Sequence, residues 1–340
     1  MAASEIGLIA RAHGVATHLL ARRTLDSLAT AEDIQALARG LVHQGTAIDA
    51  LGEPVDVFAI ERAVGGTANR HFGTLYRWQV RTPGVLDVFA AHQDRRSLRA
   101  LLRGAAEGAA AAARLQGLFP TPSLPQLALL ELARQSSPAA VVRQLVMLAH
   151  PDGGRLASVV QQSQVDLLAV DVALLRGFAE RVVRIAARAD DELRQFVSVL
   201  IDLGNAQSAL LIAREPADVN PPDLFVSGGR WLTQSTFVSA ARAGSTQHAL
   251  LVLTAALASS PMGPLLPVVP TDVAHLDRRF LITALERVTR AARLDPLSTA
   301  SVVRVLLLIE AQSLDLRALA WGAAFGTPPS MRQQQLVTPA

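Results

Sequence analysis

The sequence contains no cysteine, no lysine and few aromatic residues. Without cysteine there is no disulfide, no thiolate metal site and no cysteine nucleophile. Without lysine the phosphate-binding P-loop is excluded, because its motif requires Gly-Lys followed by Ser or Thr. Phe, Trp and Tyr together make up 4% of the chain, so the core must be built from Leu, Ala, Val and Ile.

Charge of either sign is also scarce, at 18% of residues, and the formal net charge is only +3. All 32 basic residues are arginines, and they are interspersed with acids. A nucleic-acid-binding protein normally has a basic stripe. The densest basic cluster here is Arg95, Arg96, Arg99 and Arg103, and we interpret it as a solvated helix face. Nucleic acid is therefore not an expected partner.

Hydrophobic residues make up 50% of the chain, which supports a large core and argues against disorder. The longest uncharged stretch, residues 243–271, contains four prolines, and its apolar part, 249–258, is shorter than the ~20 residues a membrane span needs. Glu5, Arg11 and His13 interrupt any apolar signal sequence near the N-terminus. We expect a soluble chain without a membrane span, able to attach to a membrane complex.

Helix signals recur along the chain and strand signals do not. Thr30 is predicted to cap a helix that Gly45 closes, and Ser137–Pro138 and Asp295–Pro296 are predicted to start two more. Leu174, Phe178, Val182 and Ile185 form one apolar stripe at helical spacing. Pro- and Gly-rich breaks separate patterns of this kind, so the predicted fold class is all-α.

A pattern of an acid, a small polar residue at +3, leucines and an arginine recurs at a period of 108 residues. The nine anchor residues are Asp94, Ser97 and Arg103; Asp202, Asn205 and Arg214; and Glu310, Ser313 and Arg317. A second match, offset by 106, relates Asp171 to Asp277, and a turn at Gly228–Gly229 follows the second copy. A long internal period indicates one unit used three times. The predicted units are 1–116, 117–222 and 223–340.

The anchors are interpreted as structural, because an acid and a polar residue at i and i+3 share one helix face. We expect the acids and arginines to connect neighbouring helices or neighbouring units. No catalytic, cofactor-binding or metal-ligating residues are predicted. Asp190–Asp191–Glu192 lacks the second acidic motif of a diphosphate-metal site. His150–Pro151–Asp152 matches the J-domain tripeptide but lacks its basic helix, so both are interpreted as turns.

Read together, the anchors resemble the C subunit of V/A-type rotary ATPases, known as the d subunit in eukaryotic V-ATPases. That family repeats Asp-x-x-Asn-Leu followed by Leu-Leu-Arg, as residues 94–103 and 202–214 do here. It also has a Gly-Gly turn before a short helix, matched by 225–229, and a C-terminal helix matched by 310–329. The opening Ala-Arg and Leu-Leu are matched at 10–11 and 19–20. In two copies Ser97 and Ser313 replace the family's Asn.

The resemblance implies an all-helical funnel of three similar units around a pseudo-threefold axis. It implies a non-catalytic central-stalk subunit, present in one copy, that seats the central stalk on the membrane rotor ring and transmits torque. Its expected partners are the proteolipid c-ring and the central-stalk subunits, at the cytoplasmic face of the membrane.

Two other functions are consistent with parts of the sequence. A generic α-helical repeat scaffold would bind protein partners on a concave face, but it normally has more repeats of shorter period. An all-α enzyme with a metal-dependent diphosphate site would need acidic clusters beyond Asp190 and Asp191.

Overall fold

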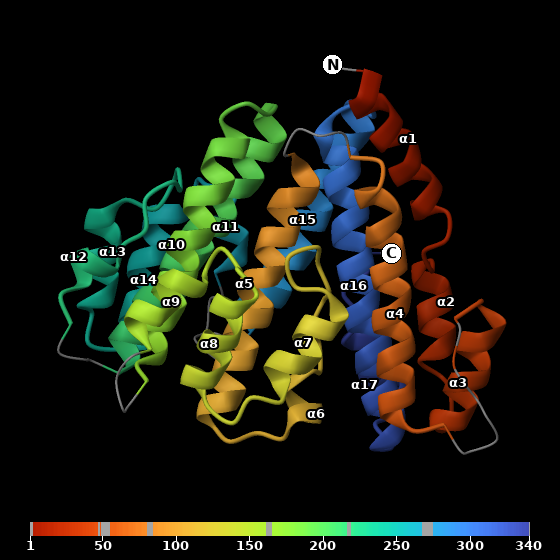
Figure 1. Ribbon diagram of the computed structural model, residues 1–340. Coiled ribbons are helices and arrows are strands. Elements are labelled where there is room, and N and C mark those ends of the chain that lie inside the picture. The colour runs from red at the N-terminus through yellow and green to blue at the C-terminus, as the bar shows by residue number, and fades with distance from the viewer. Residues whose placement is uncertain are drawn as a thin grey trace. The chain divides into compact units, whose positions relative to one another are not determined.

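The computed structural model describes residues 3–46, 48, 55–79, 84–160, 165–215, 219–266 and 275–339. In these residues the secondary structure is helical, with no strand, which confirms the predicted fold class (Figure 1). The first eight helices are α1 (Ala3–Ala16), α2 (Arg22–Leu28), α3 (Ile34–His43), α4 (Val57–Tyr76), α5 (Val85–Ala106), α6 (Ala111–Arg114), α7 (Gln126–Ala133) and α8 (Pro138–Met147). The others are α9 (Gly153–Val159), α10 (Leu167–Ala186), α11 (Asp191–Arg214), α12 (Pro221–Leu224), α13 (Gln234–Ala241), α14 (Thr246–Leu257), η1 (Gly263–Leu265), α15 (His275–Leu294), α16 (Thr299–Ala324) and α17 (Pro329–Gln334).

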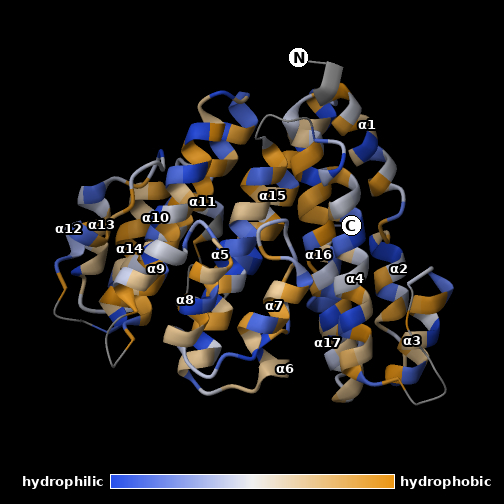
Figure 2. Cartoon of the chain, in the orientation of Figure 1, coloured by the Kyte–Doolittle hydropathy of each residue, from blue (hydrophilic) through white to orange (hydrophobic). Residues whose placement is uncertain are grey.

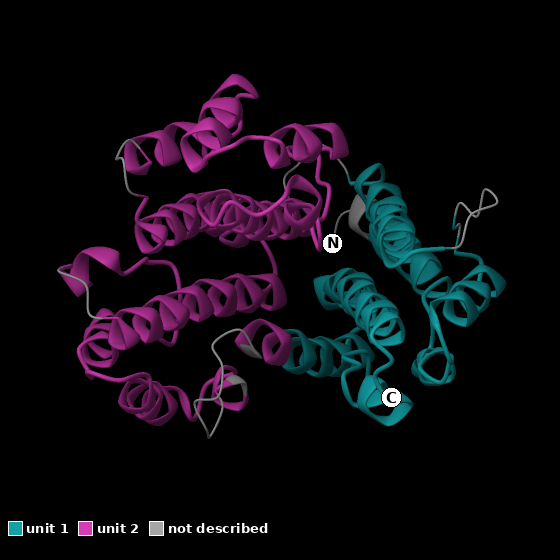
Figure 3. Ribbon diagram, turned by 90° about the horizontal axis from the view of Figure 1, so that it is seen from below, with its two compact units in different colours: residues 1–82, 281–340 teal, residues 83–280 magenta. Residues whose placement is uncertain are grey.

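The chain folds into two compact units, one of residues 1–82 and 281–340 and one of residues 83–280 (Figure 3). The first unit has a core in which α2, α3 and α4 contribute buried leucines, isoleucine and valines against α16. The second has a core between α5, α7, α8, α9 and α10. The boundaries predicted at 116/117 and 222/223 describe sequence repeats rather than compact units, and they stay a prediction.

Several helices begin at a side-chain cap. Ser137 accepts a hydrogen bond from the Ala140 N–H, and Pro138 occupies the first turn of α8, as predicted. The start of α3 differs from the prediction, because Asp33 rather than Thr30 caps it, through the Ala36 N–H. The start of α16 also differs. Residues from Asp295 form a turn, and the helix begins at Thr299.

Helix α11 is the one described helix that is long and apolar enough, by length and composition, to cross a membrane. Of its most apolar 18-residue window, 89% is buried within the protein. Burial of this kind is typical of a central core helix. The other long helices carry hydrophobic and hydrophilic residues side by side, as Figure 2 shows.

Helix α7 provides a direct test of the core of the second unit. Leu132 is fully buried there, whereas Leu127 on the same helix is 76% exposed. We expect Leu132→Ala to lower the free energy of unfolding by about 2–5 kcal/mol, because it removes buried methyl groups and leaves a cavity. Leu127→Ala is the matched control and should change it by less than about 0.5 kcal/mol. Chemical denaturation measures both, and equal effects would contradict this packing.

Candidate functional site

Each of three long helices carries one aspartate that is almost completely buried. Asp94 on α5 is 4% exposed, and Asp202 on α11 and Asp315 on α16 are fully buried. A buried carboxylate is costly unless hydrogen-bond donors satisfy it. In all three cases the donors come from the chain segment that follows the helix, 22 to 29 residues later.

Asp202 binds the turn before α13. Its Oδ2 accepts the N–H groups of Arg230 at 2.9 Å and Trp231 at 2.8 Å. One turn further along α11, the Asn205 amide exchanges two hydrogen bonds with the backbone of Val226, at 2.8 and 3.0 Å. The acid and its polar partner at +3 therefore act together, on one segment.

Glycine is needed at two positions of this turn, for a different reason at each. Gly228 has a φ of 111°, in the left-handed region that glycine adopts without strain. Gly229 lies so close to Asp202 that a Cβ there would overlap the carboxylate. The predicted turn residues are thus required by conformation and by close approach to the buried acid.

Asp94 uses side-chain donors instead of backbone donors. The hydroxyl of Thr121 donates to Oδ1 at 2.5 Å, and the hydroxyl of Ser123 donates to Oδ2. His150 Nε2 lies 3.7 Å from the same Oδ2, and its Nδ1 accepts the Asp152 N–H at 3.2 Å. The carboxylate therefore connects α5 to the segment before α7 and to the turn after α8.

In the third copy the buried acid is Asp315 and not the predicted Glu310. Asp315 accepts the N–H groups of Val337 at 2.6 Å and Thr338 at 2.9 Å. Glu310 is half-buried on the same helix. The strict period of 108 residues points to position 310, so a shift of five residues concealed the acid that performs the equivalent role.

The arginine cluster of α5 is not the solvated face that we expected. Arg95 is only 8% exposed, and its guanidinium lies 5.6 Å from the ring centre of Phe178. Burial lowers the pKa of Arg95 to about 10, while the charge of Asp277 opposes this shift. Sequence spacing placed these arginines on one face but gave no sign that α10 and α15 supply acids to that face.

Three helix-to-helix contacts follow the buried aspartates at similar spacing. Five residues after Asp94, Arg99 pairs with Asp171 of α10 at 3.2 Å. Five residues after Asp202, Gln207 donates to Asp277 of α15 at 2.7 Å. Both acids belong to the match offset by 106 residues.

The third contact lies in the first compact unit. Six residues after Asp315, the indole N–H of Trp321 donates to Glu61 of α4 at 2.9 Å. An acid on a neighbouring helix is therefore bound in all three cases, by a different side chain each time.

The three predicted arginines have different environments. Arg103 forms the expected connection between helices, bonding Asp171 at 2.5 Å. Arg214 lies beside Glu215 at 3.3 Å on the surface, with both side chains exposed, and forms no ion pair with another helix among the described residues. Arg317 on α16 faces Gly65 of α4.

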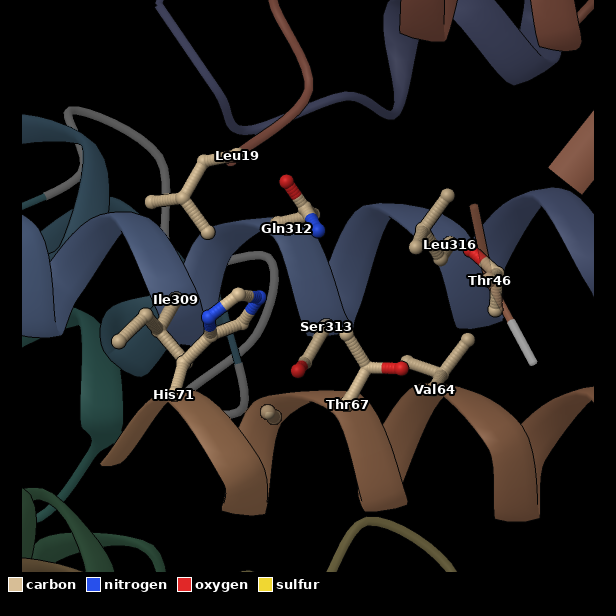
Figure 4. A pocket seen from close by; sticks show the side chains of 10 residues that line it. Leu19, Thr46, Val64, Thr67, His71, Ile309, Gln312, Ser313 and Leu316 are labelled. Carbon is tan, nitrogen blue, oxygen red and sulfur yellow. The ribbon is translucent and has the colours of Figure 1, made fainter. Parts of the chain in front are cut away.

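The polar partners Ser97 and Ser313 are both buried. Ser313 lines a cavity of about 10 Å³ between α4 and α16, with Thr67, His71 and Gln312 (Figure 4). This volume is enough for about one water molecule and too small for a ligand. Gln312 Oε1 accepts the Leu20 N–H at 2.6 Å, so the polar groups here hold the linker before α2.

The two motifs interpreted above as turns, at residues 150–152 and 190–192, have structural roles. His150 and Asp152 are buried, and Asp152 forms a bidentate pair with Arg181 at 2.7 and 2.8 Å. Asp190 caps α11 through the Leu193 N–H. In the part of the chain that the structure describes, no three metal-ligating side chains gather. The arrangement fixes loops to helices.

These features define an all-helical protein in which buried acids fix loop segments to long helices. A sequence model of the ATP synthase (C/AC39) subunit family matches residues 8–335. The chain belongs to this family, which confirms the resemblance to the V/A-type C subunit, a component of a membrane-associated ATP synthase complex.

Two known relatives align with most of this chain, and a third aligns with half of it. The V-type ATP synthase C subunit of Thermus thermophilus is 27% identical over 286 residues, or 82% of this chain and 83% of the relative. The A-type ATP synthase C subunit of Halorubrum lacusprofundi is 25% identical over 309 residues, or 86% and 85%. That of Haloferax volcanii is 28% identical over 182 residues, half of each chain.

Asp202 and Gly229 should behave as a coupled pair. We expect Asp202→Ala to lower the free energy of unfolding by about 1–3 kcal/mol, because two part-buried N–H groups lose their acceptor. Gly229→Ala should cost about 1–3 kcal/mol through overlap with the carboxylate. In the double variant the overlap is gone, so the combined loss should be smaller than the sum.

Gly154→Ala is the matched control, because a Cβ there meets nothing within 4 Å. It should leave stability unchanged or slightly raised. Urea denaturation measures the free energy of unfolding of the four variants. Strictly additive losses from Asp202→Ala and Gly229→Ala would contradict the close contact between these two residues.

Burial raises the pKa of Asp202, although three backbone N–H groups partly oppose the shift. The folded protein then binds a proton that the unfolded chain has lost, so this group's contribution to stability falls as pH rises above 3.8 through the raised pKa. We expect wild type to lose stability relative to Asp202→Asn over that range. Urea midpoints from about pH 3.5 to pH 7 measure the difference, and parallel curves would contradict the shift.

Proposed function

We propose that this chain is a non-catalytic central-stalk subunit of the rotor of a V/A-type ATP synthase. It would seat the central stalk on the membrane rotor ring and transmit torque during ATP-coupled ion transport. The observation that carries the proposal is the family match over residues 8–335. In this role the chain is peripheral, at the cytoplasmic face of the membrane, and is present in one copy.

The internal construction is consistent with a torque-bearing part. Close-packed aliphatic cores have low compressibility, so force applied to one helix reaches its neighbours with little deformation. Loops are normally the mobile part of a helical protein. Here buried carboxylates fix three post-helix segments, at Thr121–Ser123, Arg230–Trp231 and Val337–Thr338, to long helices.

We also propose that the chain contains three related units of about 110 residues in pseudo-threefold arrangement. The recurring buried aspartate, its post-helix partner and the acid on a neighbouring helix support this proposal. Superposition of residues 1–116, 117–222 and 223–340 in an experimental structure of the complex tests it.

Co-purification tests the rotor role. The full chain should carry an affinity tag at its N-terminus, because a tag at the other end would adjoin Thr338, whose N–H binds buried Asp315. We expect mild-detergent extracts of membranes to yield central-stalk and rotor-ring proteins, identified by mass spectrometry, with the untagged strain as control. Recovery of unrelated proteins instead would favour the helical scaffold.

The second test measures the coupling between ATP hydrolysis and ion uptake. In membrane vesicles that lack this chain, ATP hydrolysis by the catalytic subunits should continue while ATP-driven ion uptake is lost. Adding the purified chain should restore uptake, and the chain alone should hydrolyse no ATP. Uptake that is unchanged without the chain would contradict the proposal.

A further inference from the structure

A cavity of about 570 Å³ lies in the compact unit formed by residues 1–82 and 281–340. The linker between α1 and α2, helices α15 and α16, and the C-terminal residues Thr338 and Pro339 line it, and it is open to solvent. This volume is within the range of small-molecule sites, about 300–1,000 Å³. Leu19 lines both this cavity and the small one at Ser313, and Thr338, which lines this cavity, also donates its N–H to buried Asp315.

The cavity is lined by four arginines and a single acid. The guanidinium of Arg22 already has partners within the protein. It pairs with Asp26 at 3.0 Å and donates to the carbonyl oxygens of Gln333 and Thr338. Arg290, Arg293 and Arg304 form no ion pair or hydrogen bond with any residue that the structure describes. Three guanidinium groups are therefore available to a ligand.

The single acid does not neutralise these groups. Glu286 lies one helical turn before Arg290 and is exposed, and it forms no ion pair in the described residues. Burial lowers the pKa of Arg304, and the charge of Arg293 lowers it further. These two cations thus lie close together without a compensating anion, an arrangement that binding of an anion would relieve.

The remaining walls indicate what kind of anion fits. Thr289 places a buried hydroxyl without a partner on the same helix as Arg290 and Arg293. Leucines from the α1–α2 linker and from α16 make part of the lining apolar. Guanidinium groups match phosphate oxygens bidentately, and the apolar side offers a surface for an organic group.

We propose that this cavity binds a small phosphate-bearing molecule, with its phosphates at Arg290, Arg293 and Arg304 and its organic part against the apolar wall. A single carboxylate would leave most of the positive charge uncompensated, whereas a polyphosphate carries enough charge for three arginines. Sodium pyrophosphate and ATP share the phosphate chemistry, and comparing them shows whether the organic part contributes.

Titration calorimetry of the full chain at low ionic strength, with pyrophosphate, ATP and adenosine as probes, tests the proposal. We expect pyrophosphate and ATP to bind at one site, more weakly as salt is added, and adenosine not to bind. Tighter binding of ATP than of pyrophosphate identifies a nucleotide-type ligand, and equal binding identifies recognition of phosphate alone.

Arg293→Gln and Arg304→Gln should each weaken binding by about 10- to 100-fold, since a charged hydrogen bond is lost. Arg62→Gln is the matched control, because it removes the same charge from an exposed position of α4 that does not line the cavity. Thermal melting shows that each variant is folded. Absence of pyrophosphate and ATP binding, or an equal loss in Arg62→Gln, would overturn the proposal.

Discussion

The described structure depends on one interaction, a buried carboxylate that accepts hydrogen bonds from the segment following its own helix. The interaction is unusual because the acid is placed where desolvation is most costly. The benefit of a buried carboxylate is that its hydrogen bonds have a direction. A carboxylate has two oxygens and several acceptor positions, so it fixes both the place and the orientation of the segment that it binds. An apolar contact at the same place would fix neither.

The three versions reach this result with different donors. Backbone N–H groups serve Asp202 and Asp315, whereas hydroxyl groups serve Asp94. Backbone donors require the main chain to approach the acid closely, which at Asp202 is possible because residue 229 is glycine. Hydroxyl donors extend the reach, so no glycine is needed beside Asp94. The three places in this chain thus differ in sequence while each retains the contact.

Much of this arrangement was predictable from the sequence. Helical periodicity gave the fold class, and the repeat located Asp94, Asp202 and Asn205, whose side chains are all buried. The third acid was not found, because Asp315 departs by five residues from a strict period. The donors at Thr121, Ser123 and Thr338 could not be predicted either, since contacts between distant segments leave no periodic pattern in a single sequence. The buried state of Arg95 depends on acids from two other helices.

The exclusive use of arginine has a consequence at this buried cluster. A lysine amine loses its proton readily when buried, whereas Arg95 remains charged because its pKa, although lowered, is about 10. The positive partner in the contact between α5 and the acids of its neighbours therefore keeps its charge at neutral pH. In a component of a membrane-associated ATP synthase complex, this contact keeps its positive charge even where a buried acid such as Asp202 responds to pH.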